Sequence, residues 1–220
     1  MSNPDQGSLN QLLQWGITNS DTSQQSAQDG QAPRDPRKGL DPKMLAALLG
    51  GPSDADLMRE AMVVITATPE ESNLENKLIA WDNLEQLVEQ IDNANNMEAL
   101  KLWTPLLEQL QTEEAECRMY AAWVISTAVQ NNVRCQEKLL ALGGVQSLLD
   151  RVMQDDDQKV RKKAATALSS EVRNFQPAFD ELVEKLPKGF LTGADRLDAA
   201  DMEQVNSVVD ALRRRAADGA

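Results

Sequence analysis

Histidine is absent from this chain of 220 residues, and cysteine occurs only at Cys117 and Cys135. Without histidine, the chain lacks the commonest general base, the commonest metal ligand and the usual partner of a nucleophilic serine or cysteine. The two cysteines lie in separate helical patterns, without the close spacing of a zinc site or a disulfide framework, so we expect two reduced, mostly buried thiols. We predict that the protein is not an enzyme and uses no metal and no cofactor.

Basic residues are also scarce. Lys and Arg number 22 against 35 Asp and Glu, which gives a net charge of -13 and opposes general attraction to nucleic acid or anionic lipid. No stretch approaches the roughly 20 apolar residues needed to cross a bilayer, and the first eight residues are too polar to begin a signal peptide. We therefore expect no nucleic-acid partner, no membrane partner and a cytoplasmic location.

Apolar residues at helical spacing are what the chain does contain. The hydrophobic fraction of 41% is enough for a continuous core, and no run alternates with period two for long enough to form a strand. Short insertions of Gly, Pro, Asn and Asp separate the helical stretches. These features predict an all-α fold.

The first part of the chain differs from the rest. Residues 9–17 carry leucines and Trp15 at helical spacing, whereas residues 18–39 are rich in Ser, Gln, Asp, Gly and Pro and have almost nothing to bury. We assign residues 1–20 to an amphipathic motif and residues 21–39 to a flexible linker. A tryptophan outside any domain that buries it suggests an apolar anchor for a partner, and docking onto the protein's own domain is the alternative.

Helical signals resume at Asp41-Pro42, where an N-cap residue precedes proline at the first helical position. This helix should stop at Gly50-Gly51-Pro52, and the next should start at Ser53-Asp54 and end before Pro69. Residues 40–69 are therefore predicted to form a helical N-terminal cap.

An internal repeat is the most informative feature of the remaining sequence. Five residues recur 43 positions later, a spacing typical of armadillo or HEAT units. The pairs are Arg118 and Arg161, Ala121 and Ala164, Ala122 and Ala165, Ile125 and Leu168, and Ser126 and Ser169. Paired alanines let neighbouring helices approach closely while larger side chains fill the space between repeats. We predict armadillo-like repeats over residues 70–186, divided at about residues 100 and 143, and a connection with a capping helix over residues 187–220.

Asparagines recur near the predicted ends of the long helices. In an armadillo solenoid the long helices line the concave surface, so these amides should lie along a groove that recognises protein. Amide side chains also cap helices well, so a structural role is an equal alternative. The candidate partner-binding residues are Asn93, Ala94, Asn95, Asn96, Asn131, Asn132 and Asn174.

Other local patterns favour structural roles. Asp155-Asp156-Asp157 lacks the spaced ligands and the central glycine of a calcium loop, and is typical of a solvated turn with an N-cap. Gly143-Gly144 follows no strand and belongs to no phosphate-binding pattern, so it indicates a helix stop and restart. The basic clusters at Lys159 to Lys163 and Arg213 to Arg215 are too small to outweigh the acidic balance and predict nucleic-acid binding.

Several motifs in order along the chain resemble the armadillo-type nucleotide-exchange factors of the 70-kDa heat-shock chaperones, the fungal Fes proteins and their animal relatives. The motifs are Leu12 to Ser20, Asp41 to Leu45 with Gly50-Gly51-Pro52, Leu57 to Met62, Lys77 to Leu84, Asp92 to Asn96 and Thr127 to Asn132. The resemblance covers nearly the whole chain, although longer relatives carry at least one more repeat after the point where this sequence ends.

The resemblance implies a co-chaperone that works as a monomer without chemistry of its own. Its concave face would grip lobe II of the chaperone's ATPase domain, open the cleft and release ADP, after which ATP rebinds and client leaves. The N-terminal segment would contact the chaperone's substrate-binding domain and prevent released client from rebinding. Its anchors here would be Leu12, Leu13, Trp15, Ile17 and Asn19.

A general armadillo adaptor that binds peptides in its groove is the alternative function. Such adaptors carry tryptophans at equivalent positions of successive repeats. Trp81, Trp103 and Trp123 do not repeat in register, which favours the exchange factor.

Overall fold

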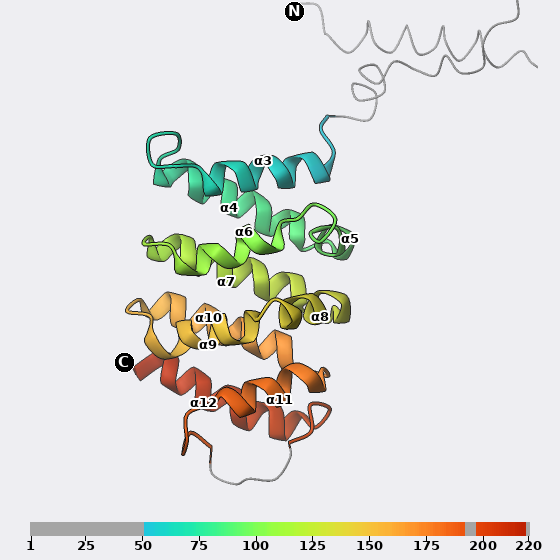
Figure 1. Cartoon of the computed structure of the whole chain (residues 1–220), viewed down its shortest axis with the longest axis vertical. Coiled ribbons are helices and arrows are strands. Elements are labelled where there is room, and N and C mark those ends of the chain that lie inside the picture. Colours follow the sequence, from blue (N-terminus) through green and yellow to red (C-terminus); the bar gives the residue numbers. More distant parts are fainter. Residues whose placement is uncertain (1–50, 192–196, 219–220) are drawn as a thin grey trace, which may run out of the picture. The chain divides into compact units, whose positions relative to one another are not determined.

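The computed structural model describes residues 51–191 and 197–218, and every element in these ranges is helical (Figure 1). The described helices lie in one compact unit, residues 53–220. They are α3 (Asp54–Thr66), α4 (Leu74–Val88), α5 (Ile91–Asn96), α6 (Trp103–Glu108), the 3₁₀ helix η1 (Gln109–Gln111), α7 (Ala115–Val129), α8 (Val133–Ala141), α9 (Gly144–Gln154), α10 (Gln158–Val172), α11 (Gln176–Lys185) and α12 (Met202–Asp218). The predicted N-terminal motif, the linker and the helix from Asp41 lie outside the described residues.

The helices stack in successive layers, and the longest ones form a continuous row (Figure 1). In this row α4 packs on α7, α7 on α10, and α10 on α12. Shorter helices cover it: α3 packs on α4, α6 on α7, and α9 and α11 on α10. Each layer contacts only its neighbours, which is the architecture of a solenoid, so the all-α, armadillo-like prediction is confirmed. No helix in the described ranges is long and apolar enough to span a bilayer.

Five buried positions repeat through the row of long helices. Their pattern starts at Leu74 in α4, returns 41 residues later at Ala115 in α7, and returns 43 residues after that at Gln158 in α10. Small residues at the first position bring the helices close, and branched residues fill the layers between them. The positions are Ala80, Ala121 and Ala164; Trp81, Ala122 and Ala165; Leu84, Ile125 and Leu168; Glu85, Ser126 and Ser169; Val88, Val129 and Val172.

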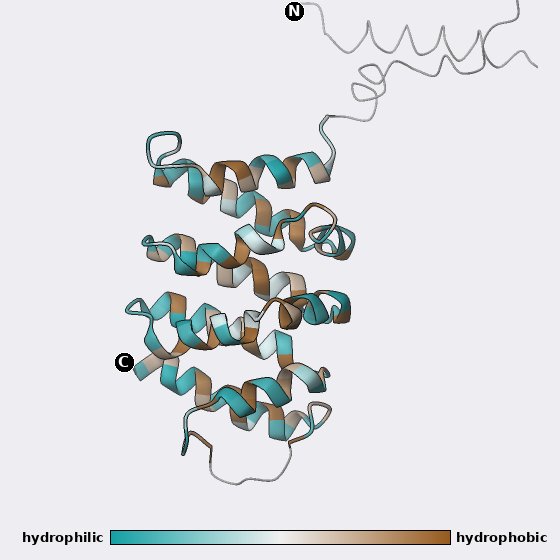
Figure 2. Cartoon of the chain, in the orientation of Figure 1, coloured by the Kyte–Doolittle hydropathy of each residue, from teal (hydrophilic) through white to brown (hydrophobic). Residues whose placement is uncertain are grey.

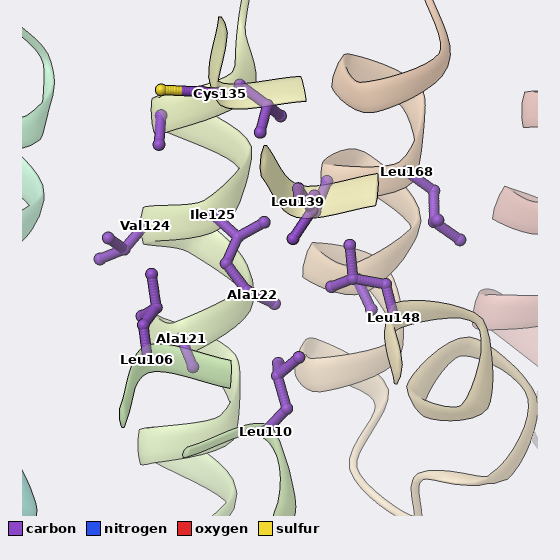
Figure 3. Close-up of a cluster of buried hydrophobic side chains, with 14 of the residues drawn as sticks. Leu106, Leu110, Ala121, Ala122, Val124, Ile125, Cys135, Leu139, Leu148 and Leu168 are labelled. Atoms are coloured by element: carbon purple, nitrogen blue, oxygen red, sulfur yellow. The ribbon is translucent and has the colours of Figure 1, made fainter. Parts of the chain in front are cut away.

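Apolar side chains from α6 to α10 join these layers into one core. Figure 3 shows Leu110, Ile125 and Leu139 pointing into the space between α7 and α10, with Leu148 across from them and Leu168 on the side of α10 turned away from α7. All five are fully buried. In Figure 2 the apolar positions alternate with polar ones along each helix, as expected for helices that bury one stripe and expose another.

The repeated arginines Arg118 and Arg161 hold equivalent loops. Nη1 of Arg118 donates to the carbonyls of Thr112 and Glu113, and Nη1 of Arg161 donates to the carbonyls of Asp155 and Asp156, at 2.7–2.9 Å in all four bonds. Each guanidinium therefore satisfies backbone acceptors in the turn just before its own helix. The repeated arginine therefore has the same structural role in both layers.

The acidic turn before α10 departs partly from the prediction. Asp157 caps α10 as expected, because its side chain accepts from the backbone N–H groups of Lys159 and Val160. Asp155 is not solvated: it is 3% exposed and accepts two bonds from Arg118, at 2.7 and 2.9 Å. The predicted solvated turn is therefore wrong at this residue, because the partner arginine lies 37 positions earlier in the chain.

The helix break at Gly143-Gly144 is confirmed. Gly143 has φ of 72°, in the left-handed region, and directly precedes α9. A side chain at Gly144 would collide with Leu139 of α8. Both glycines are therefore required where α8 turns sharply into α9.

Candidate functional site

Asn131 and Asn174 end two successive long helices in the same way. Their φ angles are 53° and 55°, a left-handed conformation that asparagine tolerates better than most residues. The following residues, Asn132 and Phe175, also share their conformation, with φ and ψ of -129° and 88° against -132° and 87°. Both asparagines are exposed. Their first role is to reverse the chain, and their side chains remain available for contact.

Three of the candidates are used inside the protein. Asn93 is buried and donates through Nδ2 to the Leu87 carbonyl and to Asp54 Oδ2, each at 2.9 Å. Asn132 is buried and caps α8. Ala94 is 2% exposed, and its carbonyl accepts from the thiol of Cys135 at 3.4 Å. These three residues therefore have structural contacts, the alternative to partner binding given above. Asn95 and Asn96 are half-buried on α5.

Stacked aromatic rings run across the row of long helices. The ring centroids of Trp81 and Tyr120 are 6.2 Å apart, and those of Tyr120 and Trp123 are 5.6 Å apart, with nearly parallel planes in both pairs. Nζ of Lys163 lies 3.5 Å from the centroid of the Trp123 ring, a cation–π contact between α10 and α7. Trp81 is fully buried, but Tyr120 and Trp123 retain exposed surface.

A hollow of about 540 Å³ adjoins Trp123 and connects α4 with the end of α7. Thr127 donates to Glu85 Oε1 at 2.8 Å across it. The hollow is lined by Glu85, Glu89, Trp123, Thr127, Gln130 and Asn131. These residues, with Tyr120 and with Lys163 on α10, are called the long-helix face below. Asn131 is the predicted candidate that lies in it.

Sequence reasoning missed most of the long-helix face. Trp123 and Thr127 lie four residues apart on one face of α7, and Asn131 follows four residues later, just past the end of the helix. This spacing is a sequence signal that connects the asparagine with Thr127 and Trp123. No local spacing predicts that Glu85 contacts Thr127 or that Lys163 contacts Trp123, because Glu85 belongs to the preceding layer and Lys163 to the following one.

The electrostatics of this face suit binding. Burial raises the pKa of Tyr120, and the carboxylates of Asp82 and Glu85 add to the rise. Burial lowers the pKa of Lys163, while Glu85 acts in the opposite direction. The described residues include no cluster of three or more acidic or cysteine side chains that could hold a metal ion. The face therefore offers aromatic surface, one ammonium, carboxylates and an amide to a protein partner.

Polar contacts join the layers along the same row. Besides the Thr127 bond to Glu85, the hydroxyls of Ser126 and Ser170 lie 3.2 Å apart and link α7 with α10. Nη2 of Arg173 donates to Asn206 Oδ1 at 2.9 Å and links α10 with α12. Such contacts fix the position of each layer relative to the next.

Comparisons with known proteins place these features in one family. The family described as nucleotide exchange factor Fes1 matches residues 9–97, and the SIL1/FES1/HPBP1 C-terminal domain matches residues 93–190. The Hsp70 nucleotide exchange factor FES1 of Gibberella zeae is 51% identical over 94% of this chain and 96% of its own length. The protein fes-1 of Neurospora crassa, with the same description, is 50% identical over 80% of this chain and 74% of its own length.

A third relative agrees with this assignment, and a solved structure shares the fold. FES1 of Coccidioides immitis is 46% identical over 93% of this chain and 96% of its own length. The crystal structure of an engineered protein shares the fold, with a TM-score of 0.51 and 16% identity over 79% of this chain and 72% of its own. The two matched regions together span the chain from the amphipathic N-terminal segment to α11 and include the whole long-helix face. This chain therefore belongs to the family of the nucleotide exchange factor Fes1.

Proposed function

We propose that this protein is a nucleotide exchange factor for a cytoplasmic Hsp70 chaperone, and that it speeds ADP release and thereby client release. The observation that carries the proposal is 51% identity to an Hsp70 nucleotide exchange factor along almost the full length of both chains. We expect the long-helix face to be the surface that binds the chaperone. The protein acts as a monomer and catalyses no reaction of its own.

The mechanism requires only a difference in affinity. If the long-helix face binds the open form of the ATPase domain more tightly than the closed form, binding shifts the population toward the open form and ADP escapes. An affinity ratio of about 10⁴ moves a two-state equilibrium from 1:99 to 99:1. We propose that the face grips lobe II of the ATPase domain and displaces the neighbouring lobe.

A rigid surface suits this mechanism. A face that deformed easily would fit the open and the closed partner almost equally, and its binding energy would shift nothing. The bonds from Thr127 to Glu85 and from Arg173 to Asn206 hold successive layers in place. The binding energy therefore goes into holding the chaperone open.

The N-terminal segment has a separate role in the proposal. Leu12, Leu13, Trp15, Ile17 and Asn19 contact the substrate-binding domain of the chaperone and keep released client from rebinding. These residues lie outside the described structure, and the proposal for them follows from the family resemblance of Leu12 to Ser20. The two activities are therefore expected to be separable by deletion.

Release of a fluorescent ADP analogue from a purified cytosolic Hsp70 tests the proposal. Wild-type protein should accelerate release, and Thr127→Lys, which places an ammonium in the hollow, should reduce the acceleration at least about tenfold at subsaturating concentration. Thr104→Lys is the matched control, because Thr104 is exposed on α6, in the row of shorter helices. No acceleration by saturating wild-type protein would reject the proposal, and peptide binding without any effect on ADP would favour the adaptor.

A further inference from the structure

The charges of the long helices change sign along the stack. The charged residues of α4 and its C-cap are four acids and one lysine, namely Glu75, Asp82, Glu85, Glu89 and Lys77. On α10 and its C-cap, every charged side chain with exposed surface is basic, namely Lys159, Lys162, Lys163 and Arg173. The one acid of α10, Glu171, has no exposed surface. Between them lies α7, whose charged residues, Glu116 and Arg118, are confined to its first turn.

The repeat register shows that this separation occurs at equivalent positions. Because α4, α7 and α10 follow one another at 41 and 43 residues, each position can be compared through three layers. The sign changes from negative to neutral to positive at Glu89, Gln130 and Arg173. Asp82 corresponds to Trp123 and Thr166, so at this position the charge is negative in α4 and absent in α7 and α10. Ile79 and Tyr120 correspond to Lys163, so at this position the charge is absent in α4 and α7 and positive in α10.

The middle layer places aromatic surface between the two charged ends. Tyr120 and Trp123 form the centre of the long-helix face, with Glu85 and Glu89 on one side and Lys163 on the other. Glu85 is 7% exposed and Lys163 is half-buried, so both are partly removed from water. Partial burial reduces the screening of such charges by salt. The face therefore carries a fixed electric dipole directed across an apolar centre.

We propose that this dipole sets the direction in which the partner docks. The long-helix face fits a surface of the Hsp70 ATPase domain that is basic where it meets α4 and acidic where it meets α10. The inference rests on the proposed function and adds to it the chemistry of the contacted surface and its orientation. The net charge of -13 attracts any basic surface in any orientation, whereas a dipole favours one orientation and penalises its reverse.

Two neutralising substitutions test the dipole against net charge. Glu89→Gln removes a negative charge from one end and Lys163→Gln removes a positive charge from the other. If the dipole orients docking, both variants should associate with the purified ATPase domain about threefold more slowly at low ionic strength, and the difference should disappear at high salt. If net charge alone steers association, the two variants should change the rate in opposite directions.

The controls separate this inference from the proposed function and from folding. Glu137→Gln on α8 and Lys188→Gln after α11 make the same charge changes at exposed positions outside the face. Lys159→Gln lies on α10 outside the cation–π contact and should reproduce the effect of Lys163→Gln. Rates that equal those of the controls, or opposite effects at the two ends, would overturn the dipole while ADP release by wild-type protein still stands. A wild-type protein that neither binds the ATPase domain nor accelerates ADP release from it would overturn both.

Discussion

Replacement of Glu171 by glutamine should stabilise the protein at neutral pH and reduce the pH dependence of its stability. Glu171 lies on α10 with no exposed surface, and neither carboxylate oxygen has a hydrogen-bond partner among the described residues. Burial raises its pKa to about 9, and the nearby carboxylate of Glu181 on α11 adds to the rise. The folded protein therefore holds Glu171 as the neutral acid at pH 7.

The size of the effect follows from proton linkage. In the unfolded chain the carboxyl titrates near 4.5, and in the folded protein near 9, so the folded state binds one more proton between these values. The contribution of this group is fully present below pH 4.5 and is lost as the pH rises toward 9, at about 1.4 kcal/mol per pH unit. At pH 7 the cumulative loss is about 3 kcal/mol. A glutamine, which keeps the shape of the neutral acid, avoids this loss.

Urea unfolding at several pH values, followed by helical circular dichroism, measures the prediction. The free energy of unfolding of Glu171→Gln minus that of wild type should grow by about 4 kcal/mol between pH 5 and pH 8. Glu184→Gln, an exposed substitution on α11, serves as the control and should give a difference that is independent of pH. A constant difference between Glu171→Gln and wild type over this range would refute the reasoning, because it would mean that Glu171 is ionised in the folded state.

Four further predictions follow from individual contacts. Arg118→Ala should lower the free energy of unfolding in urea by about 3 kcal/mol, because it leaves the buried carboxylate of Asp155 with a 3.4 Å contact to Arg151 and one backbone N–H, that of Asp157. Asn131→Gly keeps the left-handed backbone and should weaken chaperone binding at nearly unchanged stability, whereas an alanine there should also lower the melting temperature. Burial raises the pKa of Cys135 to about 11, so iodoacetamide should label it at pH 8 only after unfolding. Deletion of residues 1–20 should leave ADP release largely intact and slow client release, and equal loss of both would contradict separate roles.

The helical layers were predictable because burial repeats with a fixed period. The alanine pair at Ala121 and Ala164 and its larger neighbours occupy the same buried positions in successive layers, and such a pattern is visible in sequence. Ser53 as the N-cap of α3 was equally local, because its side chain accepts from the backbone of Asp56. These features depend on neighbours within one helix or on exact recurrence.

The long-helix face was predictable only in part. Amide side chains serve equally well as caps and as contacts, and burial decides between the two roles: Asn132 caps α8 inside the protein, whereas Asn131 lines the hollow. The contacts of Lys163 with Trp123 and of Thr127 with Glu85 join different layers. Layer spacings of 41 and then 43 residues hide these contacts from a search for one exact period.

Polar residues at buried repeat positions connect the stability of the stack with the shape of its face. Glu85 and Ser126 occupy the same position in successive layers, where an unpaired polar group would be costly. Each instead bonds to a residue of the next layer, Glu85 with Thr127 and Ser126 with Ser170. An apolar residue at these positions would fill the space but would leave the layers free to slide. These bonds therefore fix the spacing of the aromatic rings and the charged ends, and under the proposed function this is the spacing that a chaperone surface has to match.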